Sequence, residues 1–309
     1  MVKFIAERDH RTFVDDHGVT VHFYVWSPGK PRGVVQIAHG VGEHALRYEA
    51  LAQDLVNRGY AVYADDHRGH GATGVEQWSG DLTKIGKLGV GGLRATQQNL
   101  RDLATIIRRE RAGMPLALVA HSWGSLMAQN LLNAGRQPWD AVVLTGTAHR
   151  TPWGMNSGEL NARHAHLGDT GAEWLSRDPE VAAAFVADEL TTDAKVLKLF
   201  GLFDALRLYG RPKKLDRDVP LLIMVGDDDP LGGEESAAKL ANDYVGRGGL
   251  SDVQLIVYPG ARHEIFNETN QQEVRDDLMA WLDERLLGET TPSVAGGSDA
   301  ADATATSGD

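Results

Sequence analysis

Short, almost purely apolar runs alternate along most of this chain with longer amphipathic stretches. The apolar runs are residues 34–38, 61–64, 116–120, 141–144, 221–225 and 253–257. Strands that are apolar on both faces and separated by helices are typical of a parallel sheet covered by helices on both sides. The pattern therefore predicts an α/β fold with such a sheet at its centre.

The amphipathic stretches have apolar residues at helical spacing. They cover residues 45–58, 93–111, 123–133, 234–245 and 271–287. Near the N-terminus, residues 11–15 and 19–26 alternate apolar and polar side chains around Asp16-His17-Gly18, which predicts an antiparallel hairpin. We expect the hairpin and the apolar runs to form one mostly parallel, eight-stranded sheet.

No strand pattern occurs between residues 144 and 221, and this span is too long for a connecting loop. It contains two helical patterns, 180–190 and 194–208, so we expect a helical cap inserted into the sheet-forming unit. The predicted domains are 1–146 and 216–287 for the two parts of the core, 147–215 for the cap, and 288–309 for a disordered tail. The tail is assigned from its Thr, Ser, Ala, Gly and Asp content.

Composition excludes several kinds of site and partner. The chain has no cysteine, so disulfides, thiolate catalysis and zinc–thiolate centres are ruled out. A formal net charge of −12 without a basic run argues against binding to nucleic acid or anionic membranes. The start lacks a signal-peptide pattern, and no segment approaches the roughly 18 apolar residues of a transmembrane helix. We expect a cytoplasmic protein; its oligomeric state is left open.

The run 116–120 leads directly into His121-Ser122-Trp123-Gly124, and a helical pattern follows. A G-x-S-x-G turn between a strand and a helix presents a nucleophilic serine, and here Ala120 replaces the first glycine. The turn is so tight that only very small residues fit on either side of the serine, whose hydroxyl is exposed above the sheet. The following helix directs its positive end at the site. Ser122 is the candidate nucleophile; the alternative is an ordinary turn of small residues.

A serine hydroxyl needs a base, and the base needs a carboxylate that orients it. Three adjacent aspartates, at positions 227–229, follow one apolar run, and His263 follows another. Because the carboxyl ends of parallel strands share one edge of a sheet, we expect both loops to lie near Ser122. His263 is the only histidine beyond residue 166, which makes it the candidate base. The residues alone leave open which aspartate is the acid, or whether the cluster is only a solvated turn or a weak cation site.

The loop after the run 34–38 reads His39-Gly40-Val41-Gly42-Glu43-His44. In enzymes with a nucleophile elbow, one oxyanion donor comes from this loop and another from the residue after the nucleophile. The candidate donors are the backbone N–H groups of Val41 and Trp123. The two histidines of the loop could suggest a metal, but a glycine-rich loop accounts for them. We expect no metal and no cofactor.

Four blocks of this sequence resemble the monoglyceride lipase, lysophospholipase and serine-aminopeptidase-like group of α/β-hydrolases. The blocks are residues 39–44 with Arg47-Tyr48, 66–71, 121–125, and 258–264 with Asn267-Glu268. The resemblance implies the α/β-hydrolase fold and a Ser-His-Asp triad whose acid lies in a G-x-x-D pattern, which selects Asp229. The chain departs from the family pattern at Ala120 and at the bulky Trp123, which is expected to narrow the acyl pocket.

The resemblance further implies a serine hydrolase that cleaves small-molecule acyl esters, of the monoacylglycerol or lysophospholipid type, through an acyl-enzyme. A peptidase or amidase of the same fold is the alternative within enzymes, and a non-catalytic binding protein is the alternative outside them. The apolar helical pattern at 194–208 indicates packing on the core or lining of an acyl pocket. His149, His164 and His166 are expected to be solvated.

Overall fold

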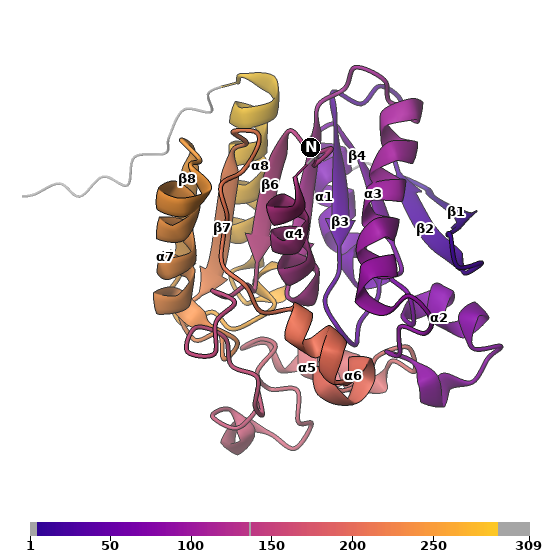
Figure 1. The fold of residues 1–309 in the computed structure, drawn as a ribbon, viewed down its shortest axis with the longest axis vertical. Helices are drawn as coiled ribbons and strands as arrows, with labels where there is room; N and C mark the ends of the chain where they lie inside the picture. Colours follow the sequence, from indigo (N-terminus) through magenta and orange to yellow (C-terminus); the bar gives the residue numbers. More distant parts are fainter. Residues whose placement is uncertain (1–4, 136, 290–309) are drawn as a thin grey trace, which may run out of the picture.

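A computed structural model describes residues 5–135 and 137–289. Its strands form one sheet in the order β1-β2-β4-β3-β5-β6-β7-β8 (Figure 1). The strands are β1 (Arg8–Val14), β2 (Thr20–Trp26), β3 (Gly33–Ala38), β4 (Tyr60–Asp65), β5 (Leu116–His121), β6 (Ala141–Thr145), β7 (Leu221–Gly226) and β8 (Val253–Tyr258). β2 is antiparallel to both β1 and β4, and the other neighbouring pairs are parallel. The predicted mostly parallel, eight-stranded sheet is confirmed.

All the helices of the described residues except α2 lie where the amphipathic stretches and the two helical patterns of 180–190 and 194–208 predicted them. The helices are α1 (Glu49–Asn57), α2 (Gly71–Gln77), α3 (Gly92–Glu110), α4 (Trp123–Ala134), α5 (Pro179–Ala187), α6 (Val196–Arg207), α7 (Gly233–Asp243) and α8 (Gln271–Leu287). Single turns are η1 (Ala45–Tyr48), η2 (Leu82–Lys84), η3 (Ala165–Leu167), η4 (Tyr244–Gly248) and η5 (Ile265–Asn267). The sequence did not predict α2, because its buried positions are Gly71, Thr73 and Gly74 rather than large apolar residues.

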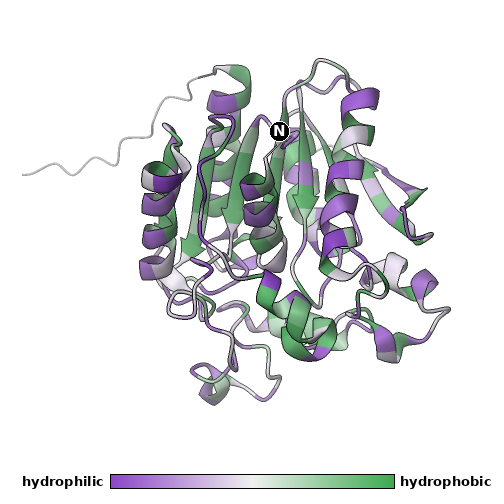
Figure 2. Cartoon of the chain, viewed as in Figure 1, coloured by the Kyte–Doolittle hydropathy of each residue, from purple (hydrophilic) through white to green (hydrophobic). Residues whose placement is uncertain are grey.

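Two hydrophobic cores lie on opposite faces of the sheet. Helices α3, α4 and α7 cover one face, and α1 and α8 cover the other (Figure 1). Along β3, Val34 and Ala38 belong to the first core, whereas Val35 and Ile37 belong to the second. This alternation explains why the central parallel strands, β3 to β7, are apolar on both faces (Figure 2). Each fully buried aliphatic side chain stabilises the fold by roughly 1.5–3 kcal/mol.

Residues 146–220 form an insertion between β6 and β7, and its helices α5 and α6 lie at the carboxyl end of the sheet (Figure 1). A small apolar cluster gives the insertion a core of its own; its buried members are Ala172, Trp174, Leu175 and Ala182. Asp178 caps the start of helix α5: its side chain accepts a hydrogen bond from the N–H of Glu180, and Pro179 occupies the first turn. The expected tail, 288–309, lies outside the described residues except for its first two.

Helix α6 is less buried than its sequence indicated. Val196 and Phe200 pack on the core, but a group of its apolar side chains is more than half exposed. These are Leu197, Leu202, Phe203 and Leu206. Gly201, with φ of 77°, interrupts the helix and divides it into two short pieces. Among the described residues, no helix combines the length and apolar character needed to cross a bilayer.

Candidate active site

Ser122 lies in the sharp turn between β5 and α4. Its φ of 51° and ψ of −123° place it in a region that side chains rarely adopt, and it shares a positive φ only with Ser79 among the described non-glycine residues. Its N–H donates to the carbonyl of Thr145 at 2.9 Å. A Cβ on Gly124 would lie 2.4 Å from the carbonyl oxygen of Ala38, so only glycine fits there. The surrounding structure therefore holds Ser122 in a conformation that costs roughly 1–3 kcal/mol.

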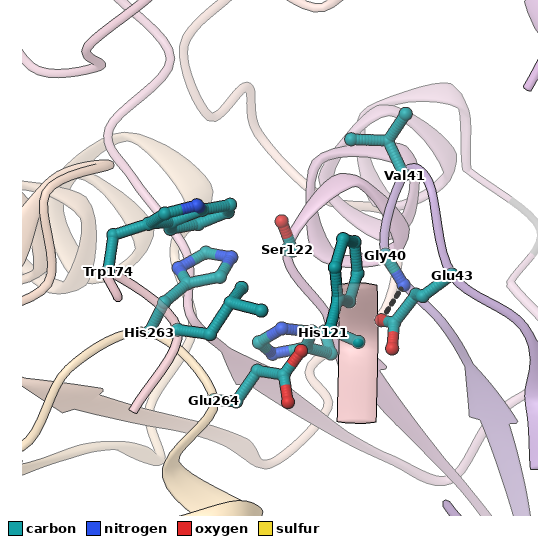
Figure 3. Close-up of a pocket in the computed structure, with 10 residues that line it drawn as sticks. Gly40, Val41, Glu43, His121, Ser122, Trp174, His263 and Glu264 are labelled. Atoms are coloured by element: carbon teal, nitrogen blue, oxygen red, sulfur yellow. Dashed lines mark hydrogen bonds between the residues drawn. The ribbon is translucent and has the colours of Figure 1, made fainter. Parts of the chain in front are cut away.

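His263 and Asp229 come from the loops that follow β8 and β7. Nδ1 of His263 is 2.9 Å from Oδ1 of Asp229, and both residues are buried. The N–H of Leu231 also donates to Oδ1, which orients the carboxylate. With Nδ1 donating to Asp229, Nε2 of His263 is left without a hydrogen-bond partner in the described part of the chain. It faces Ser122 across a small pocket (Figure 3).

The two neighbouring aspartates take other partners. Asp227 accepts a hydrogen bond from the N–H of Gly260 at 2.7 Å. Asp228 pairs with Nε2 of His164 at 2.8 Å and with Arg163 at 3.0 Å. The three carboxylates thus point to different groups, and of the three it is Asp229 that contacts His263.

The electrostatic surroundings of His263 raise its pKa. Burial by itself would lower the pKa of His263, but the charge and hydrogen bond of Asp229, with Glu264 and Glu43 nearby, outweigh it and raise the pKa above its ordinary value. His121 lies with its ring centroid 4.7 Å from that of His263. Burial, His263 and Arg47 lower the pKa of His121 well below its ordinary value, so this second histidine stays neutral.

The expected oxyanion loop lies beside Ser122. Gly40 and Val41 line the pocket together with Ser122. His39 braces the loop: its Nδ1 donates to the carbonyl of Gly40 at 2.7 Å, and its Nε2 accepts the N–H of His67 at 2.9 Å. Trp123 is the first residue of α4, so its N–H has no acceptor within the helix. Both candidate oxyanion donors are therefore next to the serine.

The side chain of Trp123 does not narrow the pocket, which corrects the expectation from the sequence. Trp123 is 1% exposed and packs against His67, His70 and Phe200, away from the pocket lining. The aromatic side chain over the site is Trp174 of the insertion, whose ring centroid is 4.7 Å from that of His263 (Figure 3).

Leu175 and Phe185, also from the insertion, line the pocket with Trp174. They leave a cavity of about 10 Å³, roughly the space for one water molecule. Sequence reasoning missed these three residues, because no motif marks them and their distance to the triad loops along the chain is large.

The expectation of solvated histidines is wrong for two of the three. His149 and His164 are each 3% exposed. His149 pairs with Asp243 at 2.9 Å, and His164 connects the insertion to the loop of Asp229. His166 is exposed as expected. The aspartate partners lie 64 and 94 residues away along the chain, which a local pattern cannot reveal.

Two carboxylates that carried no assigned role also line the pocket. Glu43 and Glu264 lie near His121 (Figure 3), and Arg47 bridges them. Nη2 of Arg47 is 2.7 Å from each carboxylate oxygen of Glu264, and its Nε is 3.2 Å from Oε2 of Glu43. Both glutamates belong to the sequence blocks noted above, and membership in these blocks is the sequence feature that could have pointed to them.

Proteins that place a serine on the strand-to-helix turn of a sheet like this one, with the acid and the histidine on later loops at the same edge, are α/β-hydrolases. This chain is one of them. The sequence profile of the serine aminopeptidase S33 family matches residues 29–270, and the chain belongs to that family.

Individual relatives agree with this assignment. The chain is similar to a monoacylglycerol lipase of Mycolicibacterium smegmatis, with 33% identity over 295 residues that cover 90% of this chain and 98% of that protein. Human monoglyceride lipase is 24% identical over 94% of this chain and 95% of its own length.

Solved structures share the fold. A thermostable carboxyl esterase from Bacillus coagulans in complex with glycerol superposes with a TM-score of 0.74 at 24% identity, covering 90% of this chain and 99% of that one. A monoglyceride lipase from Saccharomyces cerevisiae in complex with a substrate analogue gives a TM-score of 0.67 at 21% identity, covering 92% and 96%. The expected α/β-hydrolase fold and family are thus confirmed.

Proposed function

We propose that this protein is a serine esterase that hydrolyses carboxylic esters of the monoacylglycerol or lysophospholipid type. The observation that carries the proposal is the 2.9 Å pairing of His263 Nδ1 with Asp229, which leaves Nε2 free and directed at the strained Ser122. A relative that is 33% identical and is named a monoacylglycerol lipase supports the substrate class.

In this mechanism Ser122 is the nucleophile, His263 the base and Asp229 the orienting acid. Oγ of Ser122 attacks the ester carbonyl carbon while Nε2 of His263 takes the hydroxyl proton. The imidazolium then donates that proton to the departing alcohol, which leaves an acyl-enzyme. Water attacks the acyl-enzyme by the same route and releases the carboxylic acid.

The negative charge on the carbonyl oxygen would be stabilised by the N–H groups of Val41 and Trp123. Such donors contribute most when they are already in place, and one donor typically accounts for about 10²- to 10³-fold in kcat. The position of Trp123 at the start of α4 adds the positive end of the helix dipole.

We also propose that residues 147–215 act as a cap on a core made of 1–146 and 216–287. The cavity of about 10 Å³ beneath Trp174 and Phe185 is too small for an acyl chain. Substrate entry therefore requires that these side chains, or the segments that carry them, move away from Ser122.

Ester substrates fit the pocket better than aminopeptide substrates do. An aminopeptidase has to hold a cationic amine beside the scissile bond. Among the described residues that line the pocket, the carboxylates are those of Glu43 and Glu264, and Arg47 already binds both. Neither carboxylate is free to receive an ammonium group.

The proposal is tested with a chain-length series of p-nitrophenyl esters, assayed beside aminoacyl anilides. A buried methylene contributes about 0.8 kcal/mol, so kcat/KM should rise by up to about fourfold per methylene until the pocket ends. Faster cleavage of the anilides than of every ester would overturn the proposal in favour of a peptidase. If kcat/KM does not change with acyl chain length, the lipid-ester assignment is wrong.

A further inference from the structure

Glu43 lies directly against the expected oxyanion loop, and the mechanism above leaves it without a role. The residue is 4% exposed. Its Oε1 accepts a hydrogen bond from the N–H of Gly40 at 2.5 Å and another from the hydroxyl of Tyr48 at 2.8 Å. Gly40 immediately precedes Val41, so the carboxylate holds the peptide next to the candidate oxyanion donor.

The contact between Glu43 and the loop is close enough to control the loop's position. A Cβ on Gly40 would lie 2.8 Å from Oε1 of Glu43 and 3.0 Å from Cβ of Ser122. The backbone of Gly40 thus fills the space between the carboxylate and the nucleophile's own turn (Figure 3). Any displacement of the carboxylate allows the loop to shift relative to Ser122.

Arg47 links Glu43 to the loop that carries the candidate base, His263. Arg47 binds Glu43 and both carboxylate oxygens of Glu264, and Glu264 directly follows His263. The backbone N–H of Glu264 donates to the carbonyl of Leu175 at 2.7 Å, which adds the insertion to the connection. One continuous chain of hydrogen bonds therefore joins the oxyanion loop to the loop of His263.

Burying these three charged groups together adds little net stability to the fold. Two carboxylates and one guanidinium are buried together, and each buried ion carries a desolvation penalty that a good ion pair roughly offsets. Burial and the carboxylate of Glu264 accordingly raise the pKa of Glu43. What the charged group supplies and an apolar one could not is a short, strong hydrogen bond to a backbone N–H of the loop.

We propose that Glu43 is a positioning residue for the oxyanion hole: its carboxylate fixes Gly40, and thereby the N–H of Val41. Arg47 and Glu264 keep this loop in a fixed position relative to His263. The inference rests on the proposed esterase function and adds to it a residue that acts through the loop rather than on the substrate.

The test is the Glu43→Gln variant, which preserves shape but replaces a charged acceptor with a neutral amide whose NH₂ group must face another donor. We expect kcat to fall by about 10- to 100-fold, less than for loss of an oxyanion donor, with KM changed by less than about threefold. Affinity for a trifluoromethyl ketone, which reacts with Ser122 to form an oxyanion, should fall by the same factor as kcat. Affinity for the matching unfluorinated ketone should stay unchanged, because that ligand develops no oxyanion.

A matched control distinguishes positioning from general loss of stability. Asp283 is also buried, and it accepts hydrogen bonds from Arg58 at 2.6 Å and from Tyr60 at 2.7 Å, at the amino end of β4 and away from the pocket. Asp283→Asn should lower the melting temperature and leave kcat and the fluoroketone affinity at their wild-type values. If Glu43→Gln does not fold, Tyr48→Phe removes one donor to the same oxygen and should lower kcat and fluoroketone affinity together by a few-fold.

The outcomes separate this inference from the function on which it rests. If wild type cleaves esters and Glu43→Gln, or Tyr48→Phe in its place, binds the fluoroketone as tightly as wild type, the positioning role is overturned and the esterase stands. The same holds if both ketones lose affinity equally. If wild type neither cleaves esters nor binds the fluoroketone more tightly than the plain ketone, both proposals are wrong.

Discussion

The indole ring of Trp174 lies against the imidazole ring of His263, with the ring centroids 4.7 Å apart and the planes inclined by 41°. The carbonyl of Trp174 also accepts the backbone N–H of His263 at 3.4 Å. A side chain of the insertion thus both restrains the candidate base and closes the cavity above Ser122.

Replacing Trp174 with alanine should therefore change selectivity and stability together. Trp174→Ala enlarges the cavity, so the ester with the highest kcat/KM should have a longer acyl chain than in wild type. The variant should also lose about 3–5 kcal/mol of unfolding free energy, because a large side chain is removed from the small core of the insertion. The ester series and denaturant unfolding measure the two effects. An unchanged chain-length optimum would show that Trp174 does not limit the acyl site.

The acid can be identified by comparing three adjacent aspartates. Asp229→Asn should reduce kcat by roughly 10³- to 10⁴-fold, because His263 loses the partner that fixes its tautomer. Asp227→Asn and Asp228→Asn should change kcat by less than about tenfold, since their hydrogen bonds go to Gly260 and to His164 with Arg163. Steady-state ester hydrolysis by the three variants measures this. A larger loss at Asp228 than at Asp229 would assign the acid elsewhere.

The raised pKa of His263 predicts the pH at which kcat/KM falls on the acidic side of its pH profile. The base must be neutral to accept the serine proton, so kcat/KM should be full above the pKa of His263 and fall as pH drops through it. Because that pKa is raised, the midpoint should lie above 6.5, the ordinary value for histidine. Glu264→Gln removes one of the charges that raise it and should move the midpoint downward. A midpoint below 6.5 in wild type would contradict the electrostatic account.

The tight turn at Ser122 can be tested through Gly124. Gly124→Ala places a methyl group 2.4 Å from the carbonyl oxygen of Ala38, so β3 and α4 must move apart. We expect a loss of about 1–3 kcal/mol of unfolding free energy together with a fall in kcat. Gly29→Ala is a suitable control, because a Cβ there has no neighbour within 4 Å. Equal stability of the two variants would show that the turn is looser than described.

Much of the fold could be predicted because its signals are local. Strands such as β3 and β5 are apolar on both faces, and each is followed by an amphipathic stretch, so the buried parallel sheet is visible in the order of residues. The candidate nucleophile and base could be predicted for a related reason: Ser122 and His263 each follow a strand that ends at the same edge. The same argument left three adjacent aspartates as candidate acids, and it was the resemblance to the family that selected Asp229.

The residues that close the pocket could not be predicted from local patterns. Trp174 contacts His263 although the two residues are far apart in the sequence, and Phe185 approaches the pocket from a helix whose position depends on the packing of the whole insertion. The apolar sequence of α6 indicated burial, but how much of a helix is covered depends on its neighbours. The same is true of His164, whose partner Asp228 follows β7 and lies 64 residues further along the chain.

The central claim, that Ser122 is an activated nucleophile, is tested most directly by covalent labelling. A fluorophosphonate reacts with an activated serine and adds one phosphonyl group, which intact-mass spectrometry and peptide mapping can locate. We predict that wild type takes up one equivalent, located on Ser122, and that Ser122→Ala, folded to the same melting temperature within a few degrees, takes up none. Labelling of Ser122→Ala at the wild-type rate, or no labelling of folded wild type, would contradict the account.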